Sequence, residues 1–439
     1  MEVYQTMAKL KLETSKLKNM VSRVTKCNAS SGLNTISNYI ELKVSRGVFS
    51  LRTSDSFNTF IAREHLSVEE DFEAVIVAKE FVGVVLNSST KETTLDVSDS
   101  AVQMTSNGRY IFPRSVEDAG EPMTLAPINR LDNPDFRLEL KLNDLRDLIR
   151  KDSKFIGSAF DDPRLDSYYF GDKVLVTNGS IVCFNNKKFF PEPLMLKSST
   201  VSLLQQFVGD DNSTVVVEKK GMHIQIYNDT SVLDTAIHPN SGEYPVELLS
   251  KYLKGDYSSS ITVNVAALKE TLSRIVLFVD LVTQQGACIF NVEADGIHIS
   301  SYNGRATEVV KFTNPINFGP CNCYLSVPMV QRIIDMPGAD EVSICYEASN
   351  PNLEAVKADF GEDIRILGTM DESDFNSDVS NANVGANSAA VSNFMDESEP
   401  SDGNFDAFNT SAAAFSSEHS DNYSMNPTSE YEGAASHPW

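Results

Sequence analysis

The sequence predicts an α+β fold in which a unit of helix, strands, helix and strands occurs three times and an acidic tail follows. The first observation is a set of three amphipathic helix patterns, each preceded by a capping residue, Ser15, Asn143 or Asn264. These caps lie 128 and 121 residues apart. The second observation is that the same further elements follow each of these helices in the same order. We therefore expect three copies of one domain.

The first helix of each copy is identified by apolar residues on one face. In the first copy, Leu17 to Val24 follow the spacing i, i+3, i+4, i+7. The apolar residues of the other two helices are Leu145, Leu148, Ile149 and Ile156, and Leu268, Leu272, Ile275, Val276 and Val279.

Strands and a second helix complete each copy. Alternation of apolar and polar residues predicts strands at 47–57, 172–182 and 295–309. Second helices are predicted at 78–89, 198–211 and 326–338, where Pro328 is acceptable in the first turn. A last group of strands is predicted at 94–112, 214–227 and 342–360.

The stretch DKVLVTNGSIVCF, residues 172–184, reads as a β-hairpin that turns at Asn178-Gly179. Its second strand, Ile181 to Phe184, has no polar residue. In a hairpin with one solvent-exposed face, apolar and polar residues should alternate along each strand. The excess of apolar residues indicates either a core position or a surface on which a partner docks.

Composition restricts the class of protein. The chain has 439 residues and a net charge of −24, and residues 371–439 hold 13 of its 61 acidic residues and no Lys or Arg. This segment lacks a helical period, so we expect a disordered acidic tail whose simplest role is solvation. The remaining chain has 48 acidic against 37 basic residues, a balance of −11. This part of the chain can still bind DNA if its Lys and Arg residues lie on one surface.

Cysteine use and hydropathy indicate a reducing, cytoplasmic location. The six cysteines are scattered through a large chain, which argues against a disulfide framework. No apolar run is long enough to span a membrane, and the first residues lack the apolar core of a secretion signal.

Residues 7–370 resemble the bacterial-type DNA sliding clamp, the β processivity subunit of replicative polymerases. The resemblance rests on the triplicated domain and on LDSYYFGDKVLVTNGSIVCF, which is similar to the family's paired tyrosines, strand and Gly turn. GEYPVELL resembles the aromatic-Pro segment before the third domain, and RILGTM resembles the last strand. Ser180-Ile181 stand where the family usually has His-Arg, and the chain continues for 69 residues after Met370. Such a divergent clamp would fit a virus- or phage-encoded protein.

The resemblance implies a head-to-tail ring of two copies that encircles duplex DNA without sequence specificity. The domains would be 1–128, 129–256 and 257–371, with the tail at 372–439. Partners would be a DNA polymerase and a clamp loader. No cofactor, metal or catalytic residue is implied.

Helices would line the hole of such a ring, where flexible Lys and Arg side chains contact phosphates without reading bases. Lys16, Lys18, Arg23, Lys79 and Arg332 also lie on these helices. The alternative for each of these Lys and Arg residues is that it lies on an ordinary solvated helix face. The alternative for each tyrosine is that it packs within a sheet. The predicted DNA-contacting residues are Lys26, Arg146, Arg150, Lys151, Lys154, Tyr168, Tyr169, Lys197, Lys269 and Arg274.

The resemblance also implies an apolar cleft between the second and third domains that accepts a short peptide from polymerases and other partners. A Gly turn lets a peptide backbone approach, while Leu and Met give an adaptable lining. Core packing is the alternative for Val182 and Leu367. The predicted cleft residues are Phe170, Thr177, Gly179, Ser180, Val182, Pro245, Leu249, Ile366, Leu367, Gly368 and Met370.

Other classes are less well supported. The six histidines lack a metal-ligand spacing, and Cys321-Asn322-Cys323 without a nearby His reads as structural cysteine. No phosphate-binding Gly loop or nucleophile motif is present. The second hypothesis is a structural, virion-type assembly protein built from the same three repeats without DNA encircling. In the tail, Phe405 and Phe408 have the aromatic spacing of a cleft-binding peptide and could compete with partners.

Overall fold

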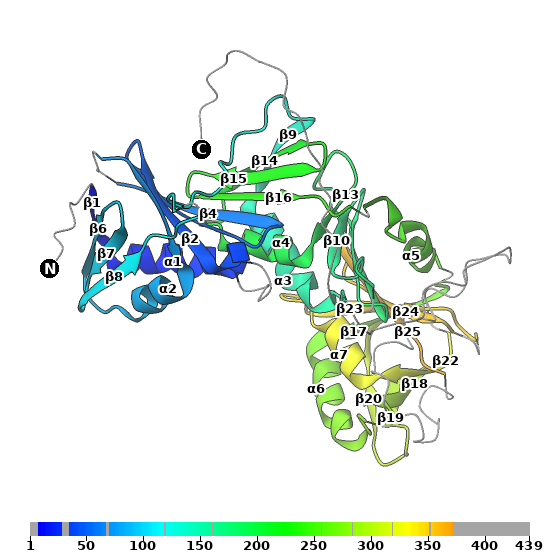
Figure 1. Cartoon of the computed structure of the whole chain (residues 1–439). Coiled ribbons are helices and arrows are strands. Elements are labelled where there is room, and N and C mark those ends of the chain that lie inside the picture. The colour runs from blue at the N-terminus through cyan, green and yellow to red at the C-terminus, as the bar shows by residue number, and fades with distance from the viewer. Residues whose placement is uncertain are drawn as a thin grey trace, which may run out of the picture.

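The computed structural model describes residues 8–28, 35–66, 70–117, 120–159, 162–239, 241–255, 257–282, 284–317, 319–350 and 353–371 (Figure 1). These residues form seven α-helices and 25 strands. The predicted acidic tail at 372–439, with Phe405 and Phe408, lies outside the described residues.

The elements fall into three units of the same order. The first unit contains β1 (Ala8–Glu13), α1 (Thr14–Asn28), β2 (Tyr39–Ser45), β3 (Val48–Ser54), β4 (Asn58–His65), β5 (Phe72–Val77), α2 (Ala78–Asn87), β6 (Glu92–Val97), β7 (Ala101–Thr105) and β8 (Arg109–Pro113). The second contains β9 (Phe136–Lys141), α3 (Leu142–Asp152), β10 (Ser167–Phe170), β11 (Val174–Thr177), β12 (Ile181–Asn185), β13 (Leu194–Lys197), α4 (Ser198–Leu203), β14 (Thr214–Lys220), β15 (His223–Asn228) and β16 (Ser231–Ala236). The third contains β17 (Ser259–Asn264), α6 (Val265–Ile275), β18 (Ala287–Glu293), β19 (Gly296–Ser301), β20 (Thr307–Val310), β21 (Phe312–Asn317), β22 (Cys321–Ser326), α7 (Val327–Ile334), β23 (Glu341–Tyr346), β24 (Ala355–Asp359) and β25 (Asp363–Gly368).

Each unit is therefore a strand, a helix, four strands, a helix and three strands. The third unit has one additional strand, β21, and α5 (Val246–Leu253) lies between the second and third units. All strand pairs are antiparallel. The predicted α+β fold of three repeated units is confirmed.

The start of the first helix is the same in all three units. The backbone N–H groups of Thr14, Leu142 and Val265 donate to carbonyl oxygens of the loop before the last group of strands, at 2.9 to 3.1 Å. Only Asn264 is a capping residue as predicted, since its side chain accepts a hydrogen bond from the Ala267 N–H. The capping predictions for Ser15 and Asn143 are wrong, because both residues lie inside their helices.

A strand that the sequence reading missed leads into each of these helices. β1, β9 and β17 each run directly into the following helix without an intervening loop. Their period-2 patterns, such as AKLKLE with alternate residues buried, are the signal that would have revealed them. The second helix α4 is also shorter than predicted and continues as a 3₁₀ turn, Leu204–Gln206.

The strands form four sheets, two of which continue from one unit into the next. The eight-stranded sheet has the order β5-β2-β3-β4-β16-β15-β14-β9, and the nine-stranded sheet has the order β13-β10-β11-β12-β25-β24-β23-β17-β21. Two four-stranded sheets, β1-β6-β7-β8 and β20-β19-β18-β22, remain at the two ends of the chain of units.

The units form a crescent with the helices of all three on its concave side and the sheets on its convex side (Figure 1). Apolar side chains between the helices and the sheets form one continuous core. All six cysteines are free, and they are buried in this core or close to it. Among the described residues, no helix is both long and apolar enough to cross a membrane.

Candidate functional site

The concave face carries most of the predicted DNA-contacting residues. Lys26 at the end of α1, Arg150 on α3 and Arg274 on α6 are exposed there. Arg146, Lys151, Lys154, Lys197 and Lys269 are partly exposed. The helix-borne bases are therefore brought to one face, although most of them already have a partner in the chain.

Several of these bases hold the units together. Arg146 donates to the carbonyl oxygens of Phe207, at 2.6 Å, and Gly209, at 3.1 Å, and so ties α3 to the segment after α4. Lys151 forms an ion pair of 2.6 Å with Asp363 of the third unit. Lys197 lies over the ring of Phe57, 4.2 Å from its centre, and so connects the second unit to the first.

Asp335 connects two predicted DNA-contacting lysines from different units. Its carboxylate oxygens lie 2.6 Å from Lys154 Nζ and 2.8 Å from Lys269 Nζ. These two ammonium groups lower the pKa of Asp335 to about 2. The lysines therefore share one anion, which a DNA phosphate would have to replace or join.

The exposed arginines are paired more loosely. Arg150 pairs with Asp147 one helical turn away at 2.9 Å, and Arg274 makes a bidentate pair with Glu308. Exposed pairs of this kind contribute only about 0–1 kcal/mol, so they can open at little cost when phosphate is near. By contrast, Lys26, Lys79 and Arg332 are exposed and have no ion pair with any described residue.

Three residues considered at the sequence level are not available to DNA. Arg23 is 6% exposed and donates to the Gln206 and Thr230 carbonyl oxygens, so it fastens α1 to the second unit. Tyr168, which was predicted to contact DNA, is 1% exposed and packs beside Phe170 in the core, as the alternative of packing within a sheet expected. Tyr169 is partly exposed but stacks on Tyr244, which lies on the other face of the same sheet.

The hairpin at 174–185 lies at the joint of the second and third units. β12 pairs along its whole length with β25, so that Val182 faces Ile366 and Ile181 faces Leu367 across the ladder. The turn is stabilised by Thr177, whose hydroxyl donates to the Ile181 carbonyl, and by Gly179, whose positive φ of 87° other residues rarely adopt.

Both faces of this sheet are covered, which explains the unbroken apolar run at 181–184. Ile181 and Cys183 belong to the main core under the helices. Val182 and Phe184 belong to a second cluster on the outer face, where Tyr244 and Leu249 from around α5 cover them. Side chains from residues 181–184 are therefore buried in an apolar cluster on each face of the sheet.

The predicted cleft residues divide into a buried and an accessible set. Phe170, Thr177, Val182, Leu249, Ile366 and Leu367 are at most 3% exposed, so core packing is their role in this conformation. Gly179 is buried as well. Ser180, Pro245, Gly368 and Met370 are partly exposed.

Three of the accessible residues continue into a strip on the third unit. The Gly368 N–H donates to the Ser180 carbonyl at 3.3 Å, and the Met370 N–H donates to the Tyr324 carbonyl at 2.9 Å. Tyr302 packs edge-to-face on Tyr324 with ring centres 5.9 Å apart. We refer to Ser180, Gly368, Met370, Tyr302 and Tyr324 as the docking strip. The sequence reading missed both tyrosines, because each lies at or just past a strand far from the C-terminal segment.

A group of possible metal ligands occurs at the β18–β19 turn. Potential ligand atoms of Glu293, Asp295 and His298 lie within 4.8 Å of one another, and among the described residues no other such group is found. The two carboxylates are exposed, and His298 already bonds Asp295 at 2.8 Å. Because exposed acidic groups often cluster without an ion, this group alone does not identify a metal site.

Comparison with solved structures gives the same architecture throughout the repeated units. The Bacillus subtilis DNA polymerase sliding clamp aligns with a TM-score of 0.70 and 14% identity over 83% of this chain and 100% of that chain. The DNA polymerase III β subunit of Thermotoga maritima aligns with a TM-score of 0.69 and 12% identity over 83% and 99%. That of Borrelia burgdorferi aligns with a TM-score of 0.69 and 13% identity over 83% and 100%.

Comparison by sequence finds no match, although comparison by structure does. No protein-family model matches the sequence, and no curated protein matches it. Identities of 12–14% show shared architecture rather than shared residues. The chain therefore has the fold of the bacterial DNA polymerase sliding clamps, in a strongly diverged sequence.

Proposed function

We propose that the chain is a DNA sliding clamp, a non-catalytic processivity factor that encircles duplex DNA and tethers a polymerase. The observation that carries this proposal is the repeated construction of the joints between units. Two joints lie within the chain, and a third of the same kind would form between two copies. The three domains of the clamp would be 1–128, 129–256 and 257–371.

Each internal joint pairs the same two strands of the repeat. In the first joint, β4 of the first unit pairs with β16, the last strand of the second. In the second joint, β12 pairs with β25, the last strand of the third unit. The equivalent strands at the two ends, β20 and β8, are sheet edges without a partner in the described part of the chain. Pairing β20 of one copy with β8 of the next would close a head-to-tail ring.

Exposed apolar residues at both ends support this closure. Ile111 on β8 is 47% exposed and Val309 on β20 is 42% exposed. Leu277, in the turn after α6, is 77% exposed. Its counterpart region after α3 contains Phe155, which is buried against the third unit and lies 4.7 Å from the Arg365 guanidinium. A second copy would cover the turn after α6 in the same way.

The concave face suits weak, sliding contact with DNA. Long basic side chains on helices can contact phosphates at many positions and carry no base specificity. Lys26, Lys79 and Arg332 would contact phosphates directly. The exposed ion pairs of Arg150 and Arg274 would break when a phosphate comes near. The lysines that share Asp335 would add a weaker attraction.

The docking strip is the proposed contact for the polymerase and for a clamp loader. It combines a Gly, a Met and two aromatic side chains, all of them partly exposed, which suits an apolar peptide segment. Pro245 lies at the start of α5, on the side of the second unit. The buried cleft residues would support this surface from below.

Primer extension on a long single-stranded circular template tests the proposal. With the cognate polymerase and loader, addition of the full chain is expected to lengthen the products formed in a single binding event at least severalfold. A structural assembly protein with the same repeats would leave product length unchanged, and that result would reject the clamp function.

A further inference from the structure

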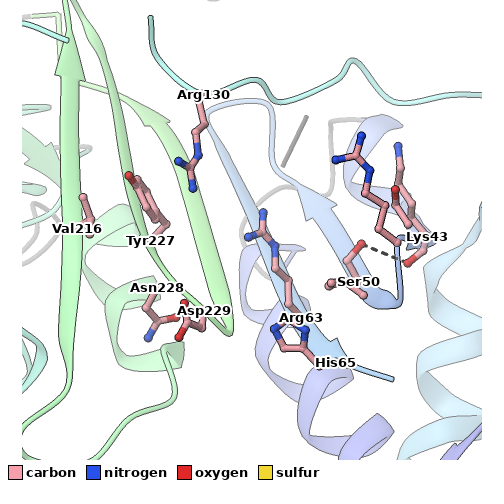
Figure 2. A pocket seen from close by; sticks show the side chains of 12 residues that line it. Lys43, Ser50, Arg63, His65, Arg130, Val216, Tyr227, Asn228 and Asp229 are labelled. Atoms are coloured by element: carbon pink, nitrogen blue, oxygen red, sulfur yellow. Dashed lines mark hydrogen bonds between the residues drawn. The ribbon is translucent and has the colours of Figure 1, made fainter. Parts of the chain in front are cut away.

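A basic pocket lies on the convex side of the joint between the first and second units. Its volume is about 350 Å³, and its lining includes the cationic Lys43, Arg46, Arg63 and Arg130 together with His65. Asp229 is the single carboxylate among the lining residues. Figure 2 shows the guanidinium groups of Arg63 and Arg130 directed into the space between strands of the two units.

The two internal joints differ on this outer face although their strand pairing is the same. At the second joint, Tyr244 and Leu249 cover an apolar surface that includes Val182 and Ile366. At the first joint, the described residues of the connecting segment, 114–117 and 120–135, form no helix. Arg63 and Lys43 project from this outer face, and a polar hollow remains open. The outer face is thus apolar and covered at the second joint, and basic and open at the first.

The cations in the pocket are held close together by the fold. Arg130 lies over the ring of Tyr227, 5.5 Å from its centre, and Lys43 forms an ion pair of 2.7 Å with Glu73, which lies outside the pocket lining. Burial and the neighbouring Arg130 lower the pKa of Arg63 to about 10. A bound anion would relieve this concentration of positive charge, because opposite charge nearby favours the charged form of a base.

We propose that this pocket binds a carboxylate-rich peptide segment, and that its occupant is the acidic segment 371–439 of this same chain. This segment carries 13 acidic residues and no Lys or Arg, so its charge complements the pocket. A random coil of 69 residues would have a root-mean-square end-to-end distance of roughly 45 Å. Binding on the convex side keeps the negative charge away from the concave face, where it would compete with DNA for the helix-borne bases.

Zero-length carbodiimide cross-linking of the full chain, followed by mass spectrometry, tests this proposal. The reagent joins a lysine to a carboxylate that touches it. Cross-links between Lys43 and acidic residues of 371–439 are expected at low salt, with at least a fivefold loss at 1 M salt, where the Debye length falls to about 3 Å. The Lys43–Glu73 cross-link serves as an internal control, since that pair belongs to the fold.

Two matched variants make the test specific. In Arg46→Glu/Arg130→Glu, both changed side chains are exposed, and the cross-links to the acidic segment are expected to fall at least fivefold while Lys43–Glu73 remains. Lys251→Glu/Lys254→Glu makes the same charge change on exposed positions around α5 and is expected to behave as the unmodified chain.

Two outcomes would overturn the proposal. One is the formation of Lys43–Glu73 without any cross-link from Lys43 to 371–439. The other is an equal loss of these cross-links in both variants. Mixing isotope-labelled and unlabelled chains identifies the source of the bound segment: cross-links within one copy are expected, and cross-links only between copies would contradict binding by the same chain.

Discussion

Arg365 of β25 lies with its guanidinium 4.7 Å from the ring of Phe155, and so joins the second unit to the third. The side chain is fully buried, and it donates to the carbonyl oxygens of Ile333 at 2.8 Å and of Lys151 at 3.1 Å. A buried cation in this position satisfies groups from both units that would otherwise lack a partner. The rigidity of the crescent depends on such contacts.

Replacing this arginine is expected to weaken the joint. Arg365→Met removes the donors and leaves the carbonyl groups of Ile333 and Lys151 buried without them. The expected loss in free energy of unfolding is about 2–4 kcal/mol, which urea denaturation followed by circular dichroism would measure. Arg150→Met on the exposed face of α3 is the control and should change stability by less than about 0.5 kcal/mol. Equal stability of both variants would contradict a structural role for Arg365.

Asp152 at the same joint predicts a pH dependence of stability. Burial raises the pKa of this carboxyl to about 7, although Arg365 and Lys151 act in the opposite direction and Asp363 adds to the rise. A folded-state pKa above the unfolded value means that the native state holds more protons, so its contribution to stability falls as pH rises from about 4 to about 7. The Asp152→Asn variant is therefore expected to be more stable than the unmodified chain at pH 8, by an amount on the order of 2 kcal/mol.

The difference between these two proteins isolates Asp152 from other titrating groups, such as Glu41, whose pKa is also raised to about 7 by burial. Below about pH 4 the two proteins should have similar stability, because Asp152 is then neutral in both states. Chemical denaturation at several pH values provides the measurement. A constant difference from pH 4 to pH 8 would show that Asp152 does not titrate in this range.

The helix-borne bases without ion pairs predict the salt dependence of DNA binding. Changing Lys26, Lys79 and Arg332 together to Gln is expected to weaken binding to duplex DNA without a loss of stability. Each phosphate contact that disappears should lower the slope of log affinity against log salt by about 0.9. Lys188→Gln/Lys251→Gln/Lys254→Gln, three changes away from the helices of the concave face, is the matched control and should keep the original slope. A fluorescence anisotropy titration at several salt concentrations would detect the difference.

Met370 in the docking strip predicts the site of partner binding. Met370→Asp places a charge on an apolar contact and is expected to weaken binding of a polymerase-derived peptide at least tenfold, about 1.4 kcal/mol. DNA binding should not change. Met222→Asp is the control, because Met222 is 51% exposed in the turn between β14 and β15, which belong to the eight-stranded sheet and not to the sheets of the docking strip. If both variants bind the peptide as the unmodified chain does, the docking strip is not the partner site.

The fold could be predicted from the sequence because its signals are local and occur three times. The spacing of Leu17, Val21 and their counterparts identified the helices, and Asn264 identified one helix start correctly. The starts at Thr14 and Leu142 could not be found by capping rules, because Ser15 and Asn143 lie inside their helices and a strand runs directly into each helix.

The sites were harder to predict, because exposure depends on contacts between units. Tyr168 and Tyr169 are neighbours in one strand, but one is buried in the main core and the other stacks on the opposite face. Likewise, the apolar run at Ile181 to Phe184 left core packing and partner docking open, and the structure shows that α5 and the helices cover both of its sides. The basic pocket combines Lys43, Arg63 and Arg130 from separate segments, and no sequence motif connects them.

Retention on circular against linear DNA tests the central claim most directly. A ring that encircles DNA is expected to stay on a nicked circular plasmid during gel filtration after loading, and to be lost when a restriction enzyme linearises the plasmid. Val309→Asp, which charges the free edge of β20, should remove retention on the circle, whereas Val208→Asp at a similar exposure should not. Equal retention of the unmodified chain on circular and linear DNA would contradict the ring and with it the proposed function.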